Sequence, residues 1–305
     1  METVTPNVRT VTTVRGCNPS VVTTSDGVVV IDTPQLPTHA VRLRSEAERD
    51  GPVRYVVNTE HHVDHVFGNH WFKGAGELVN HREIDRLFMA GGPELEPFDY
   101  AASAVPMDDP GGAELLPSRE QYFAEAHRAT VVFTGDLTLT VGRHTFHLLH
   151  TPGHTPGQTA VYVPQERVVF TGDTVFSECQ TWLMNSDIDQ WLTALERIAA
   201  LDVDHVVPGH GPVTTPSYLD VQRKVLLEWV DAVAEAVALG WSRPETVERV
   251  SFAERYPVDV GQGYMMQHIQ TLNAGSLWDK LAGRPAAAPP GRGHPQEQEV
   301  DAWQP

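Results

Sequence analysis

The sequence predicts an α/β fold with two β-sheets packed face to face, helices on their outer faces and a helical C-terminal part. Short β-rich runs occur in two separate blocks, and the second block repeats the layout of the first. Helical segments follow each block, and a sheet that is apolar on one side must bury that side against another layer. The chain is long enough for one large core, with 305 residues of which 41% are hydrophobic.

The first block predicts a β-hairpin, two helices and two further strands. In chain order its elements are strands Val21–Thr24 and Val28–Ile31, helix Leu36–Asp50, strand Val53–Val57, strand Glu77–Asn80 and helix Arg82–Met89. The turn Ser25-Asp26-Gly27 joins the first two strands. Residues Gly91 to Pro117 are rich in Gly and Pro and lack periodicity, which predicts a long loop that either covers a pocket or is mobile.

The second block predicts more strands and then helices. Its strands are Thr130–Phe133, Leu137–Val141, Thr145–Leu149, Gln158–Val163, Arg167–Phe170 and Val203–Val207. Ser186 heads a helix with Asp189 in capping-box position, and a longer helix begins at Thr215-Pro216. We expect one domain over residues 1–284, with 215–284 as its helical C-terminal part. Residues 285–305 are expected to be a disordered tail, because their composition cannot bury a core.

The charge balance and the cysteine count exclude several classes of protein. Lys and Arg number 22 against 40 Asp and Glu, and the net charge of −18 repels nucleic acid. No run of about 18 apolar residues occurs, and the first residues lack the apolar segment of a secretory signal, so we expect no membrane partner and a cytoplasmic location. Cys17 and Cys179 are too few for a disulfide framework or a cysteine-based zinc cluster. The oligomeric state stays open.

Four polar clusters stand at the ends of predicted strands. They are Glu60-His61-His62-Val63-Asp64-His65, His150-Thr-Pro-Gly-His154, Thr171-Gly172-Asp173 and Pro208-Gly209-His210-Gly211. Imidazole and carboxylate groups together suit zinc, iron or manganese, and short spacings let several side chains converge on one point. The glycines allow the tight turns that aim a neighbouring His or Asp inward.

In this order, the four clusters resemble the signature of the metallo-β-lactamase superfamily: His-x-His-x-Asp-His, a later Gly-His, a Gly-Asp and a terminal Gly-His. The resemblance covers residues 7–214 and includes the hairpin from Asp26 to Asp32 and the lead-in Asn58-Thr59. It implies a four-layer αββα sandwich of the metallo-β-lactamase type and a metal-dependent hydrolase. Because this fold hosts many reactions, the resemblance says less about the substrate.

The resemblance also implies a set of metal ligands. They are His62 and His154 for a first metal ion, Asp64, His65 and His210 for a second, and Asp173 as a bridge between both. One position departs from the signature. When Asp64-His65 is aligned with the Asp-His pair of the signature, the first histidine of the signature falls at residue 60, which is Glu60. A register shifted to use His61 fails, since the next ligand position would then be Val63.

Three interpretations of Glu60 remain open. In the first, Glu60, His62 and His154 form a two-histidine, one-carboxylate site that favours iron or manganese over zinc. In the second, only one metal ion binds tightly. In the third, the chain has lost catalysis and serves as a binding module.

Other residues near the clusters have plainer interpretations. His61 is expected to face solvent or to support a ligand, and His150 to hydrogen-bond a ligand or the backbone. Trp182, Tyr264 and His268 either line a substrate pocket or, as the preferred interpretation, pack in the core.

The function expected from these residues is hydrolysis of a small carbonyl substrate, such as an ester, thioester or lactone. A metal-bound hydroxide would attack the carbonyl, one ion would polarise its oxygen, and the other would stabilise the leaving group. Asp64 or Asp173 would hold that hydroxide. The expected cofactor is one or two divalent metal ions, zinc first, with iron or manganese as alternatives. The alternative function is an iron-dependent oxidoreductase or oxygenase on the same fold, motivated by Glu60.

Overall fold

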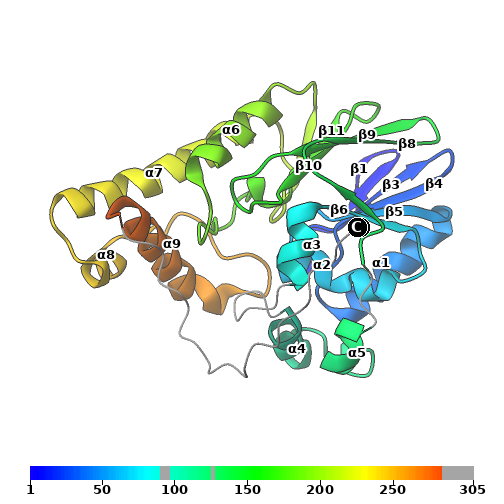
Figure 1. Ribbon diagram of the computed structural model, residues 1–305, viewed down its shortest axis with the longest axis horizontal. Coiled ribbons are helices and arrows are strands. Elements are labelled where there is room, and N and C mark those ends of the chain that lie inside the picture. The colour runs from blue at the N-terminus through cyan, green and yellow to red at the C-terminus, as the bar shows by residue number, and fades with distance from the viewer. Residues whose placement is uncertain (90–96, 125–127, 284–305) are drawn as a thin grey trace, which may run out of the picture.

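The computed structural model describes residues 1–89, 97–124 and 128–283. Two β-sheets lie one above the other, with helices on the outer side of each (Figure 1). The predicted two-sheet α/β sandwich with a helical C-terminal part is therefore confirmed. The predicted tail, residues 285–305, lies outside the described residues. Among the described residues, no helix is both long and apolar enough to cross a lipid bilayer.

The first sheet has seven strands in the order of the chain. They are β1 (Glu2–Thr5), β2 (Val8–Thr10), β3 (Ser20–Thr24), β4 (Gly27–Ile31), β5 (Val53–Val57), β6 (Glu77–His81) and β7 (Val131–Phe133). Neighbours are antiparallel from β1 to β4 and parallel from β4 to β7. Parallel strands direct their carboxyl ends to one edge, so β4 and β5 end side by side.

The second sheet has five strands in the order β12-β11-β10-β9-β8. They are β8 (Leu137–Val141), β9 (His144–His150), β10 (Thr159–Val163), β11 (Val168–Phe170) and β12 (His205–Val207). The grouping of Thr130–Phe133 with this block is wrong, because β7 pairs with β6 in the first sheet, Val79 opposite Val131. That pairing covers the edge of β6, which would otherwise expose unpaired backbone groups.

Helices and short 3₁₀ turns fill the connections between strands. They are α1 (Pro37–Asp50), α2 (Val63–Val66), η1 (Phe67–Phe72), α3 (Arg82–Met89), α4 (Pro97–Asp108), η2 (Pro110–Gly112), α5 (Arg119–Ala124), η3 (Gly172–Thr174), α6 (Ile188–Ala199), α7 (Tyr218–Ala238), α8 (Arg243–Arg249), η4 (Gly263–Met265) and α9 (Met266–Leu281). Helix α6 runs along the outer side of the second sheet and α7 packs next to α6 and α9, whereas α1 lies on the outer side of the first sheet (Figure 1).

Three apolar layers hold these elements together. Side chains such as Val29, Phe146 and Phe170 fill the space between the sheets. A second layer joins α1 to the first sheet, and a third joins α6, α7 and α9 to the second sheet, with Trp191 and Trp229 as its largest buried members. Burial of apolar surface is the dominant favourable term in folding, so these layers fix the sheet edge on which the polar clusters meet.

Two predictions about helices are corrected. Part of the loop predicted over residues 91–117 is helical, because α4 buries Phe98 and Ala101 against Phe67 and Tyr122 and gains its stability from that packing. The N-cap of α6 is Asp187, whose carboxylate accepts a hydrogen bond from the Gln190 backbone N–H, and not Ser186.

Candidate metal centre

The four polar clusters meet at one edge of the two sheets. The segment after β5 carries Glu60, the loop between β9 and β10 carries His154, and η3 after β11 carries Asp173. The segment after β12 carries His210. Since β11 and β12 are parallel, their carboxyl ends deliver Asp173 and His210 to the same point.

The first group of metal-ligand side chains is Glu60, His62, His154 and Asp173, which offer ligand atoms within 4.8 Å of one another. The Nε2 atom of His154 lies 3.4 Å from Asp173 Oδ2 and 3.7 Å from Glu60 Oε2. His62 Nδ1 lies 2.6 Å from Glu60 Oε2. The two distances from His154 are of the size expected between ligand atoms that are each about 2 Å from one ion, whereas His62 and Glu60 are at hydrogen-bonding distance.

The second group is Asp64, His65 and His210, again with ligand atoms within 4.8 Å. His210 Nε2 lies 3.3 Å from Asp64 Oδ2, and His65 Nε2 lies 3.8 Å from the same oxygen. The other oxygen of Asp173, Oδ1, lies 3.1 Å from His65 Nε2 and 3.3 Å from His210 Nε2. Asp173 thus faces the first group with Oδ2 and the second with Oδ1, as a bridging ligand would.

The burial of these atoms fits a divalent cation. Within the described ranges, Glu60 Oε1 is buried and has no hydrogen-bond partner. Glu60 is completely buried and Asp173 is 4% exposed. A buried carboxylate without a partner is costly, and a cation between such groups removes that cost. The donor set of imidazoles and carboxylates suits zinc, iron or manganese.

Glu60, the residue that departs from the family signature, lies among the predicted ligands. Its carboxylate faces His62 and His154, whereas the adjacent His61 belongs to neither ligand group. Of the two positions expected for His61, exposure to solvent is wrong, because His61 is 7% exposed, and its ring centre lies 4.7 Å from that of the predicted ligand His62. Burial, with His62 as the next cause, lowers the pKa of His61 to about 2, so this ring is neutral.

Two carboxylates outside the predicted set orient the ligand histidines. Asp32 Oδ2 lies 2.9 Å from His65 Nδ1, and Asp259 Oδ2 lies 2.8 Å from His210 Nδ1. Asp32 has a φ of 58° and is held there by two hydrogen bonds from Thr59, from its backbone N–H and its hydroxyl. Such partners fix ring orientation and raise the basicity of the ligand nitrogen. The sequence contained no signal for Asp259, which lies 49 residues from His210.

Burial and the neighbouring carboxylates oppose each other in setting the pKa values of the four histidines. Burial lowers the pKa of His65, but Asp173 and Asp32 more than offset it and raise that pKa well above its ordinary value. The pKa of His210 is raised in the same way, burial being outweighed by Asp173. Burial lowers the pKa of His154, and Glu60 only partly offsets this. Burial also lowers the pKa of His62, but Glu60 more than offsets it and raises that pKa, so carboxylates favour positive charge in both groups.

Two glycines allow the close approach of the loops. A Cβ atom on Gly209 would lie 1.9 Å from Asp173 Oδ1, so any side chain there would displace this carboxylate. Gly172 has a φ of 49°, and its Cβ would meet the Thr59 hydroxyl oxygen at 2.4 Å. The glycines beside the predicted ligands are thus required by contact distance as well as by backbone conformation.

The remaining predictions for neighbouring residues have mixed outcomes. The expected backbone contact of His150 is confirmed, because its Nε2 lies 2.9 Å from Pro156 O. Trp182 packs against the core as preferred. Core packing is wrong for Tyr264, which is 63% exposed, and for His268, which is also exposed. Tyr264 lies in η4 and His268 in the first turn of α9, and both side chains lie at the surface.

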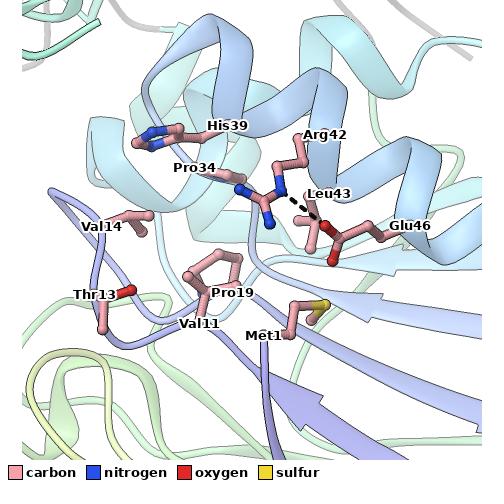
Figure 2. A pocket seen from close by; sticks show the side chains of 10 residues that line it. All are labelled: Met1, Val11, Thr13, Val14, Pro19, Pro34, His39, Arg42, Leu43 and Glu46. Atoms are coloured by element: carbon pink, nitrogen blue, oxygen red, sulfur yellow. Dashed lines mark hydrogen bonds and ion pairs between the residues drawn. The ribbon is translucent and has the colours of Figure 1, made fainter.

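A separate pocket of about 130 Å³ lies between the N-terminal strands and α1 (Figure 2). Its lining residues are Met1, Val11, Thr13, Val14, Pro19, Pro34, His39, Arg42, Leu43 and Glu46. Arg42 and Glu46 pair with each other across one wall, at 2.8 Å. None of the seven predicted ligands lines this pocket, so it is distinct from the metal centre.

Comparisons with known proteins agree with this fold. Residues 12–210 match the model of the metallo-beta-lactamase superfamily. The chain is 26% identical over 206 residues to the Beta-lactamase-like protein 2 homolog of Caenorhabditis elegans, which covers 66% of this chain and 58% of that protein. It is 26% identical over 201 residues to an acyl-coenzyme A thioesterase of Bos taurus, which covers 61% of this chain and 70% of the thioesterase.

A solved structure supports the same assignment. The metallo-beta-lactamase family protein TTHA1429 of Thermus thermophilus has a TM-score of 0.62 at 17% identity, covering 92% of this chain and 95% of that one. The chain thus spans less than two thirds of the length of the worm relative. Its fold matches that of TTHA1429 over 92% of this chain. On the family match, the sandwich and the converging polar loops, the chain belongs to the metallo-beta-lactamase superfamily.

Proposed function

We propose that this chain is a metal-dependent hydrolase of a small carbonyl substrate, such as an ester, thioester or lactone. The observation that carries the proposal is the pair of ligand groups joined by Asp173, with one carboxylate oxygen facing each group. We assign Glu60, His62 and His154 to a first ion, Asp64, His65 and His210 to a second, and Asp173 to both. When bound, such ions supply Lewis-acid chemistry, activating water and polarising a carbonyl oxygen.

The residues of the chain would divide the remaining work. Asp64 has a side chain that is 16% exposed, whereas Glu60, Asp173 and His65 are buried, so Asp64 faces the open side of the centre. Its carboxylate is suited to accept a hydrogen bond from the attacking water and to orient it. Asp32 and Asp259 hold the rings of His65 and His210 in place.

The relatives support hydrolysis more than they support one substrate. The bovine relative is an acyl-coenzyme A thioesterase, and a thioester is one of the three substrate classes proposed here. The net charge of −18 favours a small molecule over nucleic acid.

An iron-dependent oxidoreductase or oxygenase is the second candidate. The structure brings Glu60 together with His62 and His154, which is the two-histidine, one-carboxylate set used by many iron oxygenases. The same observation makes manganese or iron alternatives to zinc in the hydrolase.

The first experiment measures the metal content and spin state of protein purified without added metal and without oxygen, by elemental analysis and electron paramagnetic resonance. About two zinc or manganese ions per chain would support hydrolysis, and an ester, thioester and lactone panel would follow. About one iron ion per chain would favour the oxygenase, and protein that binds no added metal would contradict both.

A second experiment tests the hydrolytic centre directly. Asp64→Ala should reduce hydrolysis of the best panel substrate by at least about 100-fold, because it removes a metal ligand and the group that orients water. The matched control is Asp202→Ala, which removes an exposed carboxylate far from the centre, paired with Arg167. If Asp64→Ala and Asp202→Ala hydrolyse at the same rate, the proposed mechanism is wrong.

A further inference from the structure

Residues 250–262, which carry Asp259, lie between α8 and η4 and form neither helix nor strand. They belong to the helical C-terminal part, whereas the match to the family model ends at His210. The carboxylate that lies 2.8 Å from His210 Nδ1 therefore comes from outside the matched residues. Because this segment lacks the hydrogen bonds of a helix or a sheet, its position depends on bonds from other parts of the chain.

Gln180 binds this segment on the N-terminal side of Asp259. Its side-chain Nε2 donates hydrogen bonds of 2.7 Å to Tyr256 O and 3.1 Å to Phe252 O. Its backbone N–H donates another, of 2.9 Å, to Pro257 O. Gln180 is 4% exposed, so water does not compete for these bonds. Three hydrogen bonds from one buried residue therefore hold the chain just before Asp259.

Gln180 is in turn held by Gln270, a residue of α9 that is 2% exposed. Gln270 Nε2 donates a hydrogen bond of 2.9 Å to Gln180 Oε1. Gln270 Oε1 accepts one of 2.6 Å from the Phe252 backbone N–H. The side-chain amide of Gln180 thus has partners for its two N–H groups and for its oxygen, which fixes its orientation.

The chain just before Gln180 contacts His210 directly. The ring of Phe176 is stacked on that of His210, with ring centres 5.2 Å apart and 2° between the planes. The Ser177 N–H donates a hydrogen bond of 2.9 Å to His210 O. Phe176 contacts the face of the ring and Asp259 contacts its edge at Nδ1, so together they restrict its orientation. Gln180 connects the two contacts, because it lies on the same stretch of chain as Phe176 and binds the segment of Asp259.

The segment has a second anchor on the C-terminal side of Asp259. The side chain of Arg15 is 4% exposed and forms an ion pair with Asp108 of α4. Its Nη2 atom donates a hydrogen bond of 2.8 Å to the Tyr264 hydroxyl, and a Cβ atom on Gly261 would lie 3.6 Å from Arg15 Cβ. Asp259 therefore lies between two anchored stretches of chain.

We propose that Gln180 positions Asp259 against His210, and that the helical C-terminal part thereby sets the affinity for the second ion. A partner that holds a ligand histidine fixes the direction of its lone pair, and loss of such a partner lowers metal affinity about 10–100-fold. This inference rests on the two ligand groups of the proposed function. It gives a part of the chain beyond the family match a role in the metal centre.

The test measures both zinc affinities of the full chain, freed of metal beforehand, by competition with a chromophoric chelator. Gln180→Glu replaces two N–H donors with an oxygen that repels Tyr256 O and Phe252 O, so Kd for one zinc ion should rise at least about tenfold. Kd for the other zinc ion should change less than about threefold. Gln180→Ala removes the same bonds without adding a buried charge and should show the same pattern.

A double-mutant cycle distinguishes positioning from a merely structural effect. Asp259→Ala should raise the same Kd at least about tenfold, because His210 loses its partner. Adding Gln180→Glu to Asp259→Ala should change that Kd by less than about a further threefold, since Gln180 acts only through the missing carboxylate. Effects of the two substitutions that multiply in the double variant would contradict the proposal.

The matched control is Asn273→Asp, which likewise changes a buried amide into a carboxylate. Asn273 is completely buried in α9, donates a hydrogen bond of 2.8 Å to Thr181 O and accepts one of 2.8 Å from the Leu183 backbone N–H. This variant should lower the melting temperature and leave both zinc affinities within about threefold of the wild type. If Gln180→Glu and Gln180→Ala give the same result as Asn273→Asp, the role of Gln180 is wrong.

Zinc binding and hydrolysis test different claims. If the wild-type chain binds a single zinc ion, the inference fails while a hydrolase with one ion stands. If the zinc affinities change as expected but no ester, thioester or lactone is hydrolysed, the role of Gln180 stands and the proposed function fails.

Discussion

At position 60, a fully buried glutamate faces two histidines from the same ligand group. Three carboxylates, Glu60, Asp64 and Asp173, together with a hydroxide would balance the charge of two divalent ions. A histidine at position 60 would leave such a centre with one positive charge, which attracts hydroxide more strongly. We therefore expect the residue at position 60 to affect both the metal preference and the pH range in which water is activated.

Glu60→His should raise the affinity for zinc, because it replaces a carboxylate with the softer imidazole that zinc favours. We expect the pH at which hydrolysis reaches half its maximal rate to fall as well, since the centre becomes more positive. Zinc affinity is measured by competition with a chromophoric chelator, and the rate as a function of pH. His61→Gln is the control, because His61 lies in the same loop outside both ligand groups and should leave both quantities unchanged. An unchanged zinc affinity in Glu60→His would show that Glu60 is no ligand.

At the scale of elements, α6 supports the loop that carries His154. Trp191 on α6 is completely buried, and its indole N–H donates a hydrogen bond of 2.9 Å to Thr174 O, next to Asp173. Its ring centre lies 5.0 Å from that of His154, and a Cβ atom on Gly153 would lie 2.4 Å from Trp191 Cα. One helix face therefore packs directly on two loops of the metal centre.

Trp191→Ala should reduce the free energy of unfolding by about 3–5 kcal/mol, the usual result of deleting a buried aromatic side chain. Metal content should fall as well, because His154 loses the ring against which it packs. Urea denaturation and elemental analysis measure the two effects. Trp182→Ala serves as the comparison, since Trp182 is half-buried and packs next to His268 instead of a predicted ligand. A larger loss of stability in Trp182→Ala would contradict the role assigned to α6.

At the scale of the whole molecule, the centre concentrates buried charge that the fold must stabilise. In the metal-free protein, burial raises the pKa of Asp64, but His65 and His210 outweigh it and lower that pKa to about 2. The raised pKa values of His65 and His210 mean that these rings stabilise the metal-free fold as cations. This contribution is complete below the unfolded histidine pKa of about 6.5 and is lost as the pH rises through the folded pKa.

Metal removal should therefore destabilise the protein more at alkaline pH than at pH 6. Binding requires neutral histidines, so bound metal replaces the protons that stabilise the metal-free form, and affinity rises with pH. A free metal concentration of 100 times Kd would add about 2.7 kcal/mol to the free energy of unfolding. Melting temperatures with metal and with a chelator, at pH 6 and pH 9, measure the difference. An equal or smaller effect of the chelator at pH 9 would contradict this account.

The sequence alone determined the fold class and the family signature. Alternating apolar runs predicted most strands, with Val53–Val57, Leu137–Val141 and helix Arg82–Met89 at the bounds that the structure has. These elements can be predicted from neighbouring residues alone, because a strand or helix that buries one face repeats its apolar residues at a short, regular spacing. The four motifs could be recognised for the same reason, because each is a short run of residues that follows one predicted strand.

Only the tertiary structure decided which residues complete the centre. Asp259 binds His210 from 49 residues away, and Arg15 joins Asp108 and Tyr264 from segments with no common pattern. The helix α4 likewise depends on Phe67 and Tyr122, which lie outside it. Contacts between distant segments leave no local period in the sequence, so packing alone brings these partners together.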